Sequence, residues 1–180
     1  TCALPIWSMA VNLSTLQFEQ PSLVKTVLDC LTRHSVPPGM LILEVTETTA
    51  MNNPDESVRV LTALTDAGVK ASIDDFGTGY SSLLYLKRLP ACELKIDRAF
   101  VKELSGESED ATIVSAIVAL AKTLNLKVVA EGVETAAQQT FLTELGCNTL
   151  QGYLLGKPIT AQAIMEQCQH GEMSPPRAQS

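Results

Sequence analysis

Short runs of β-branched and aliphatic residues alternate along the chain with longer segments whose apolar residues recur at helical spacing. This pattern is typical of repeated β-α units around a parallel sheet. We expect six strands, over residues 9–13, 41–46, 69–75, 93–96, 127–130 and 149–153. Six units are too few for a closed eight-stranded barrel of roughly 250 residues, so the sheet is either open or lacks strands upstream. We favour the second alternative: an α/β chain that forms an incomplete TIM-like (β/α) barrel, with about six of the eight strands present.

Helix boundaries between these strands are also marked. Asn53 can cap a helix, Pro54 suits its first position, and Glu56 completes a box-like capping arrangement. Thr135 and Gln138 repeat the capping pattern before a later helix. These signals predict helices of defined length that pack on the sheet.

The two ends of the chain differ in composition from the rest. Residues 1–7, Thr-Cys-Ala-Leu-Pro-Ile-Trp, resemble the in-frame translation of a sequencing adapter, and we expect them to be an assembly artefact. A natural edge strand or loop is the alternative. We expect residues 8–170 to form the domain and residues 171–180, which are rich in Pro, Ser and Gln, to be a disordered tail or linker.

Charge and cysteine content narrow the choice of partner and compartment. The net charge of -7 disfavours a nucleic-acid polymer or an anionic membrane surface as a partner. The five cysteines form no C-x-x-C pair, which argues against a disulfide framework or a zinc site and favours a cytoplasmic location. Charges or prolines interrupt every apolar run before the roughly 18 residues of a membrane helix. Anchoring of a parent protein through other segments stays open.

Polar residues stand at the carboxyl end of every expected strand, where parallel β-α folds bind their ligands. In chain order they are Asn12, Glu44, Glu47, Asp74, Asp75, Lys95, Asp97, Glu131, Glu134 and Gln151. Carboxylates gathered this closely repel one another and need cations. Oxygen ligands suit Mg²⁺ or Mn²⁺, whereas zinc prefers Cys or His. The two histidines, His34 in a helix and His170 near the tail, are assigned no function.

Each of these residues also has an ordinary interpretation. A single acid at a strand end is most often a helix cap or a solvated charge, and Asp97 could simply pair with Arg98 or Lys95. Gln151 could satisfy backbone groups, and Asn12 could be a turn residue. Lys95 has a stronger claim, since a lysine on an inward strand position needs anionic partners. The joint occurrence of such residues across six strands favours a shared site.

The adjacent pair Asp74 and Asp75 sets a geometric requirement. Neighbouring side chains of a strand point to opposite faces, so both can reach one site only if the backbone turns directly after the strand. Gly77 and Gly79 permit that turn and would make the loop mobile, as a lid requires. The expected flexible loop comprises Phe76, Gly77, Thr78 and Gly79. A plain Gly-rich connection is the alternative.

Six motifs stand in the order found in a known family. They cover residues 11–14 (Val-Asn-Leu-Ser), 44–47 (Glu-Val-Thr-Glu), 74–83 (Asp-Asp-Phe-Gly-Thr-Gly-Tyr-Ser-Ser-Leu), 94–97 (Leu-Lys-Ile-Asp), 130–134 (Ala-Glu-Gly-Val-Glu) and 151–153 (Gln-Gly-Tyr). With them the chain resembles the EAL-domain phosphodiesterases, which open cyclic di-GMP to linear pGpG. By this resemblance residues 8–170 would be a partial EAL domain.

The resemblance implies a site with two Mg²⁺ or Mn²⁺ ions. Asn12, Glu44 and Asp74 would hold one ion, and Asp74 would bridge to a second ion with Asp75 and Glu131. The chemistry would be in-line attack of water on phosphorus, which two cations promote.

The resemblance also implies roles for the other polar residues. Lys95, which would act in catalysis with Asp75 and Glu131, would contact the attacking water or the scissile phosphate. Glu47 would anchor the loop after the third strand, while Glu134 and Gln151 would complete the site floor and the water network.

One departure from the family is plain: no Glu-Ala-Leu tripeptide occurs in the sequence. In the family this tripeptide lies on an earlier strand of the barrel and supplies a metal-binding Glu. We therefore expect the 180-residue chain alone to hydrolyse no cyclic di-GMP. A non-catalytic cyclic di-GMP receptor and a protein-interaction domain are the alternative functions. The parent protein is expected to be a homodimer with upstream GGDEF, PAS or other sensor domains.

Overall fold

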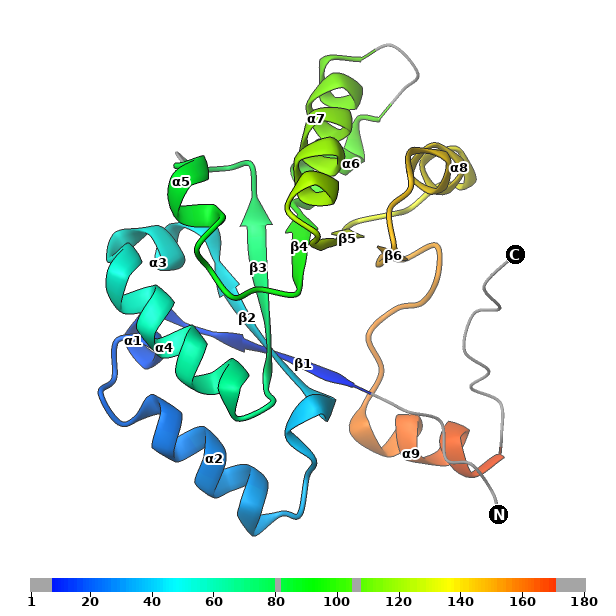
Figure 1. Cartoon of the computed structure of the whole chain (residues 1–180). Coiled ribbons are helices and arrows are strands. Elements are labelled where there is room, and N and C mark those ends of the chain that lie inside the picture. The colour runs from blue at the N-terminus through cyan, green and yellow to red at the C-terminus, as the bar shows by residue number, and fades with distance from the viewer. Residues whose placement is uncertain (1–7, 80–81, 105–107, 171–180) are drawn as a thin grey trace.

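Six parallel strands form one sheet in the computed structural model, which describes residues 8–79, 82–104 and 108–170. The strands are β1 (Met9–Leu13), β2 (Leu41–Thr46), β3 (Lys70–Phe76), β4 (Glu93–Ile96), β5 (Lys127–Ala130) and β6 (Thr149–Leu150). They lie side by side in chain order, and each is joined to the next by a helical crossover (Figure 1). The predicted α/β class, an incomplete TIM-like (β/α) barrel, is confirmed.

The helices that connect the strands cover the outer face of the sheet, and one last helix follows β6 (Figure 1). They are α1 (Thr15–Phe18), α2 (Leu23–Arg33), the 3-10 helix η1 (Pro38–Met40), α3 (Glu47–Asn52), α4 (Pro54–Asp66), α5 (Leu83–Leu86), α6 (Arg98–Lys102), α7 (Glu109–Thr123), α8 (Ala136–Leu145) and α9 (Ala161–His170). Helix α4 packs on β3, and α7 packs on β4 and β5. Val45, Ile73 and Leu94 lie side by side in the sheet and have no exposed surface, so they form part of the core beneath these helices.

The opposite face of the sheet carries the polar residues. Asn12 pairs with Glu44 across β1 and β2, and Glu44 pairs with Ser72 across β2 and β3. Because side chains alternate between faces, Asp74 lies on the same face as Ser72, two residues further along β3. Lys95 lies on this face of β4 for the same reason, since Glu93 pairs with Ser72. The strand alternation therefore collects the candidate site residues inside the curved sheet.

The predicted helix caps are mostly confirmed. The Asn53 side chain accepts a hydrogen bond from Glu56 N at the start of α4. The expected second half of that box is wrong, because the Glu56 carboxylate binds Arg59 one turn further on instead. At α8 both halves form: Thr135 accepts from Gln138 N, and the Gln138 side chain accepts from Thr135 N.

The third strand is shifted by one residue, and the sixth strand is shorter than predicted. The sixth strand, β6, ends at Leu150 instead of residue 153. Gln151 N still donates to Ala130 O at 2.9 Å, but the next residue passes very close to the segment after β5. A Cβ on Gly152 would lie 2.1 Å from Val133 O, so only glycine permits this approach. The chain turns there and leaves the sheet.

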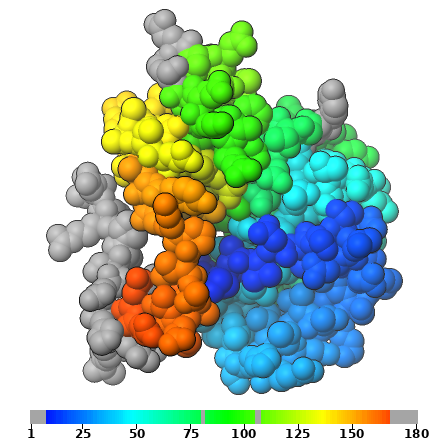
Figure 2. All heavy atoms as spheres, turned by 180° about the vertical axis from the view of Figure 1, so that it is seen from behind, coloured from blue at the N-terminus to red at the C-terminus, as the bar shows by residue number. Residues whose placement is uncertain are grey.

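Each edge strand has one neighbour among the described strands. On the β1 edge Met9 is 63% exposed and Val11 is 42% exposed. The segment after β6 leads to α9, which lies beside the beginning of β1; Figure 2 shows this contact between the orange and dark blue segments (also Figure 1). None of the described helices is long and apolar enough to span a membrane. The expected artefact at residues 1–7 and the expected tail at 171–180 lie outside the described residues.

Candidate metal centre and active site

A buried ammonium group lies among three carboxylates at the carboxyl ends of the strands. Lys95 Nζ is 2.8 Å from Glu44 Oε1, 3.1 Å from Asp74 Oδ1 and 2.7 Å from Glu131 Oε1. Lys95, Glu44 and Asp74 are all less than 8% exposed. Three acidic groups therefore share one positive charge, and the cluster attracts further cations.

Burial and charge together change the proton affinities of this cluster. Burial alone would lower the pKa of Lys95, but hydrogen bonds to Glu131 and Glu44 and the charge of Asp74 outweigh it, so the pKa is raised. Burial raises the pKa of Glu131 despite the opposing hydrogen bond from Lys95. Burial, followed by the charge of Asp74, also raises the pKa of Asp75. Lys95 thus stays positively charged, while two acids bind protons more readily than usual.

Asp75 reaches the cluster because β3 carries a bulge at this residue. The register between β3 and β4 shifts there, and Asp75 has a φ of 54°. A left-handed backbone is rare for a residue other than glycine and costs on the order of 1–3 kcal/mol. One oxygen each of Asp74, Asp75 and Glu131 lies within 4.8 Å of the others. The predicted turn thus begins in Asp75 itself, before Gly77, and the strand continues to Phe76.

Asn12 brings an amide group to the same oxygens. The end of its side chain lies 3.2 Å from Asp74 Oδ2 and 3.3 Å from Glu44 Oε2. With its nitrogen turned toward them, the amide donates to both carboxylates. With its oxygen turned toward them, it faces only acceptors, and a cation between the three groups would satisfy all of them. The oxygens of these three residues therefore fit a hard divalent cation, and those of Asp74, Asp75 and Glu131 fit a second.

Glu47 holds the beginning of the loop that follows β3. This side chain is 2% exposed, and its Oε2 accepts a hydrogen bond from Gly77 N at 2.8 Å. Gly77 has a φ of 100°, and a Cβ there would lie 2.8 Å from the Phe100 ring. A Cβ on Gly79 would approach Glu47 Oε1 to 3.0 Å. Glycine is therefore required at residue 77, whereas a side chain at residue 79 would need a small shift of Glu47. The mobility expected for the loop stays a prediction.

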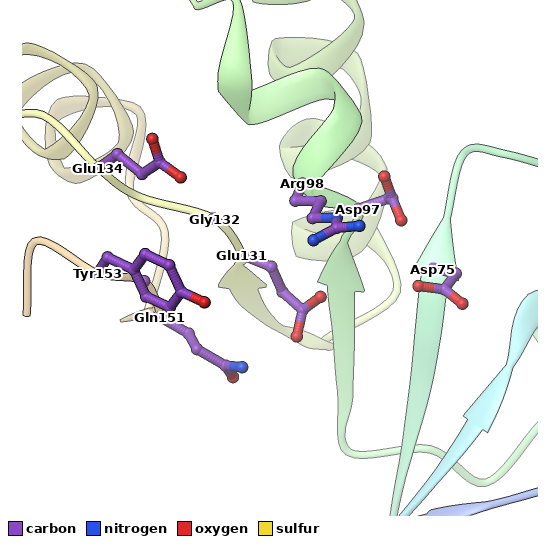
Figure 3. Close-up of a pocket in the computed structure, with 9 residues that line it drawn as sticks. Asp75, Asp97, Arg98, Glu131, Gly132, Glu134, Gln151 and Tyr153 are labelled. Atoms are coloured by element: carbon purple, nitrogen blue, oxygen red, sulfur yellow. The ribbon is translucent and has the colours of Figure 1, made fainter. Parts of the chain in front are cut away.

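A pocket of about 480 Å³ lies next to the acidic cluster (Figure 3). It is lined by Asp75, Asp97, Arg98, Glu131, Gly132, Glu134, Gln151, Gly152 and Tyr153. In Figure 3 Glu131 lies between Asp75 on one side and Gln151 and Tyr153 on the other. The cavity thus joins the cluster to the segments that follow β5 and β6.

The structure clarifies the residues around β4 that the sequence left open. Asp97 caps α6, because its Oδ1 accepts a hydrogen bond from Ala99 N at 2.6 Å, and it also lines the pocket. Sequence reasoning assigned no site role to Arg98 or Tyr153, although both line the pocket. Arg98 directly follows Asp97, and Tyr153 lies two residues after Gln151, so their closeness to a strand-end polar residue was the available signal.

Known proteins provide an independent comparison. The EAL domain family model matches residues 3–158. MucR of Pseudomonas aeruginosa, described as a bifunctional diguanylate cyclase/cyclic di-GMP phosphodiesterase, is 65% identical over 159 residues, which are 88% of this chain and 23% of MucR. The chain thus spans about a quarter of this relative.

Solved structures show the same similarity in three dimensions. The structure titled "PaMucR Phosphodiesterase, c-di-GMP complex" has a TM-score of 0.85 and 65% identity, covering 88% of this chain and 64% of that chain. Klebsiella pneumoniae BlrP1, solved with manganese and cyclic di-GMP, has a TM-score of 0.75 and 35% identity, covering 84% of this chain and 39% of its own. Because the family model covers most of the sequence and these folds agree, the chain belongs to the EAL domain family.

Proposed function

We propose that this chain carries the catalytic centre of a phosphodiesterase that hydrolyses cyclic di-GMP to linear pGpG with two Mg²⁺ or Mn²⁺ ions. The observation that carries the proposal is the convergence of oxygen ligands from Asn12, Glu44, Asp74, Asp75 and Glu131 around one space. Two relatives support it: MucR is described as a cyclic di-GMP phosphodiesterase, and BlrP1 was solved with manganese and cyclic di-GMP.

Two overlapping groups of residues would hold the cations. Asn12, Glu44 and Asp74 form the first group, and Asp74, Asp75 and Glu131 form the second. When bound, such ions lower the pKa of a water molecule and stabilise the entering and leaving oxygens at phosphorus. The strained backbone of Asp75 is what allows two successive residues to serve this purpose.

Lys95 would exchange one of its carboxylate partners for substrate. An ammonium group has three hydrogens, and the carboxylates of Glu44, Asp74 and Glu131 already surround it at 2.7 to 3.1 Å. A phosphate oxygen or the attacking water must therefore replace one carboxylate. Glu131 is the partner that leaves, because its side chain is the most exposed of the three at 17%. Glu131 is then free to bind a cation or to accept a proton.

The pocket beside the cluster would hold the remainder of the dinucleotide. The Arg98 guanidinium group can donate hydrogen bonds to a phosphate or a base edge there, and Glu134 and Gln151 can bind water or sugar groups. Glu47, through its bond to Gly77 N, would keep the loop after β3 next to the bound substrate.

The proposal is tested with the protein encoded by the complete reading frame around this chain. Purified protein is incubated with cyclic di-GMP and Mg²⁺ or Mn²⁺, and the products are separated by chromatography. We expect pGpG from the wild type and a loss of at least about 100-fold in kcat for Asp74→Asn, because both cation groups lose a charged ligand. Tight binding of cyclic di-GMP without turnover would favour the receptor alternative instead.

A further inference from the structure

Gln138 uses its whole side-chain amide to connect two segments of backbone. Its Oε1 accepts hydrogen bonds from Glu134 N at 2.8 Å and Thr135 N at 2.9 Å. Its Nε2 donates to Val101 O at 2.9 Å and Lys102 O at 3.2 Å. A carboxamide has two donor hydrogens and two acceptor lone pairs, so all four are used. The side chain is only 6% exposed, and breaking these bonds would leave backbone groups without partners.

The two connected segments carry neighbouring parts of the pocket lining. One segment follows β5 and contributes Glu131, Gly132 and Glu134; the other is α6, which begins at Arg98. Helix α6 has five residues, so its end, which Gln138 holds, lies about one turn from Arg98. The segments also touch at the pocket itself, where a Cβ on Gly132 would lie 2.6 Å from Arg98 Cβ. Their spacing is thus fixed at two points.

The segment after β5 is also held from its other side. Val133 N donates to Gln151 O at 3.0 Å, and Leu154 N donates to Val133 O at 3.0 Å. Glu134 therefore stands between Val133, which is bound to the segment after β6, and Thr135, which is bound to Gln138. Without the Gln138 side chain, Glu134 N would lose its hydrogen-bond acceptor, and the segment would lose its hydrogen-bonded link through Gln138 to α6.

Helix capping alone does not explain a glutamine at this position. A capping box needs only an acceptor at its third residue, and glutamate serves as well as glutamine. The bonds to Val101 O and Lys102 O require N–H donors, which glutamate lacks at neutral pH. The amide is therefore selected by the contact with α6.

We propose that Gln138 is a positioning residue for cyclic di-GMP, which holds Glu134 and Arg98 at the spacing that the pocket requires. This inference rests on the proposed function of the site. Gln138 does not line the pocket, and it acts through the two segments that it joins.

The variant Gln138→Glu separates the two roles of this side chain. It keeps an oxygen for Glu134 N and Thr135 N, but it places a second oxygen against the carbonyls of Val101 and Lys102. Gln138→Ala removes both roles. Gln139→Ala is the matched control, because Gln139 is the next residue of α8 and its side chain makes no hydrogen bond among the described residues.

The variants are compared in the protein from the complete reading frame by KM, kcat, the Mn²⁺ concentration for half activation, and the dissociation constant of cyclic di-GMP from calorimetry. For Gln138→Glu we expect KM and the dissociation constant to rise about tenfold, which corresponds to about 1.4 kcal/mol, with kcat and the Mn²⁺ requirement changed less than about threefold. Gln138→Ala should raise KM and the dissociation constant in the same way. Gln139→Ala should match the wild type in all four quantities.

Three results would overturn the inference. A Gln138→Glu protein whose KM and dissociation constant stay within about twofold of wild type would show that only the cap matters. A loss confined to the melting temperature would show a purely structural role. If the wild type binds no cyclic di-GMP, both proposals fail; if it binds without turnover, the proposed function fails, and the dissociation constants still decide the role of Gln138.

Discussion

Replacing Lys95 by Met removes an ammonium group from the acidic cluster while keeping a side chain of similar length. Glu44, Asp74 and Glu131, now 2.7 to 3.1 Å from Nζ, would lose their shared partner in a buried setting. Breaking a buried ion pair by removing one member costs about 3–5 kcal/mol. We expect this loss in the free energy of unfolding in EDTA. For a chain of this size it corresponds to a fall of about 6–20 °C in melting temperature.

Thermal unfolding followed by circular dichroism, in EDTA and in Mn²⁺, measures this effect. Mn²⁺ should raise the melting temperature of Lys95→Met more than that of the wild type, because a cation replaces the lost charge. Lys25→Met is the control: Lys25 pairs with Asp29 on the surface, where both side chains are more than half exposed, and its loss should cost less than about 1 kcal/mol. If both variants melt at the same temperature in EDTA, or if Mn²⁺ stabilises Lys95→Met no more than the wild type, the charge argument is wrong.

Three further predictions concern pH, packing and the loop. In EDTA the stability contributed by Asp75 and Glu131 should fall as pH rises above their ordinary pKa values of 3.8 and 4.5, because their raised pKa values let the folded state bind more protons than the unfolded state. The urea concentration at the midpoint of unfolding, measured at about pH 5 and about pH 7, tests this direction. A higher midpoint at about pH 7 would contradict it. Gly152→Ala should lower the free energy of unfolding by more than about 2 kcal/mol, since its Cβ would clash with the backbone of Val133. Gly156→Ala, which has open space around its Cβ, should lower it by less than about 1 kcal/mol. Equal losses in denaturant unfolding would exclude this steric explanation. Glu47→Ala should cost about 1–3 kcal/mol by the same assay, because a loop amide loses its buried acceptor, and an unchanged midpoint would refute the anchoring role.

The strands could be predicted because their sequence pattern is local. Four of them, β1, β2, β4 and β5, occupy the predicted residues, and the order of polar strand ends follows from parallel pairing alone. The end of β6 could not be predicted in this way. Gly152 ends that strand through a contact with Val133, and such an approach of distant backbone leaves no mark in the periodicity.

Two features of the site also depend on tertiary structure. The bulge at Asp75 places a non-glycine residue at a φ of 54°. Aspartate adopts this conformation more often than most residues, but the sequence does not indicate which of the two aspartates does so. Gln138 is recognisable as part of a capping box, but its bonds to Val101 and Lys102 cross 37 and 36 residues of sequence. The sequence thus indicates which residues carry charge to the site, while the folded chain determines how they are held.

We propose that the oxygens of Asn12, Glu44, Asp74, Asp75 and Glu131 hold two divalent cations next to the substrate pocket. Anomalous diffraction from crystals of the complete protein grown with Mn²⁺ and cyclic di-GMP would locate these ions. We predict two manganese peaks on either side of Asp74, both next to a substrate phosphate. A single peak, or manganese bound away from these five side chains, would contradict the claim.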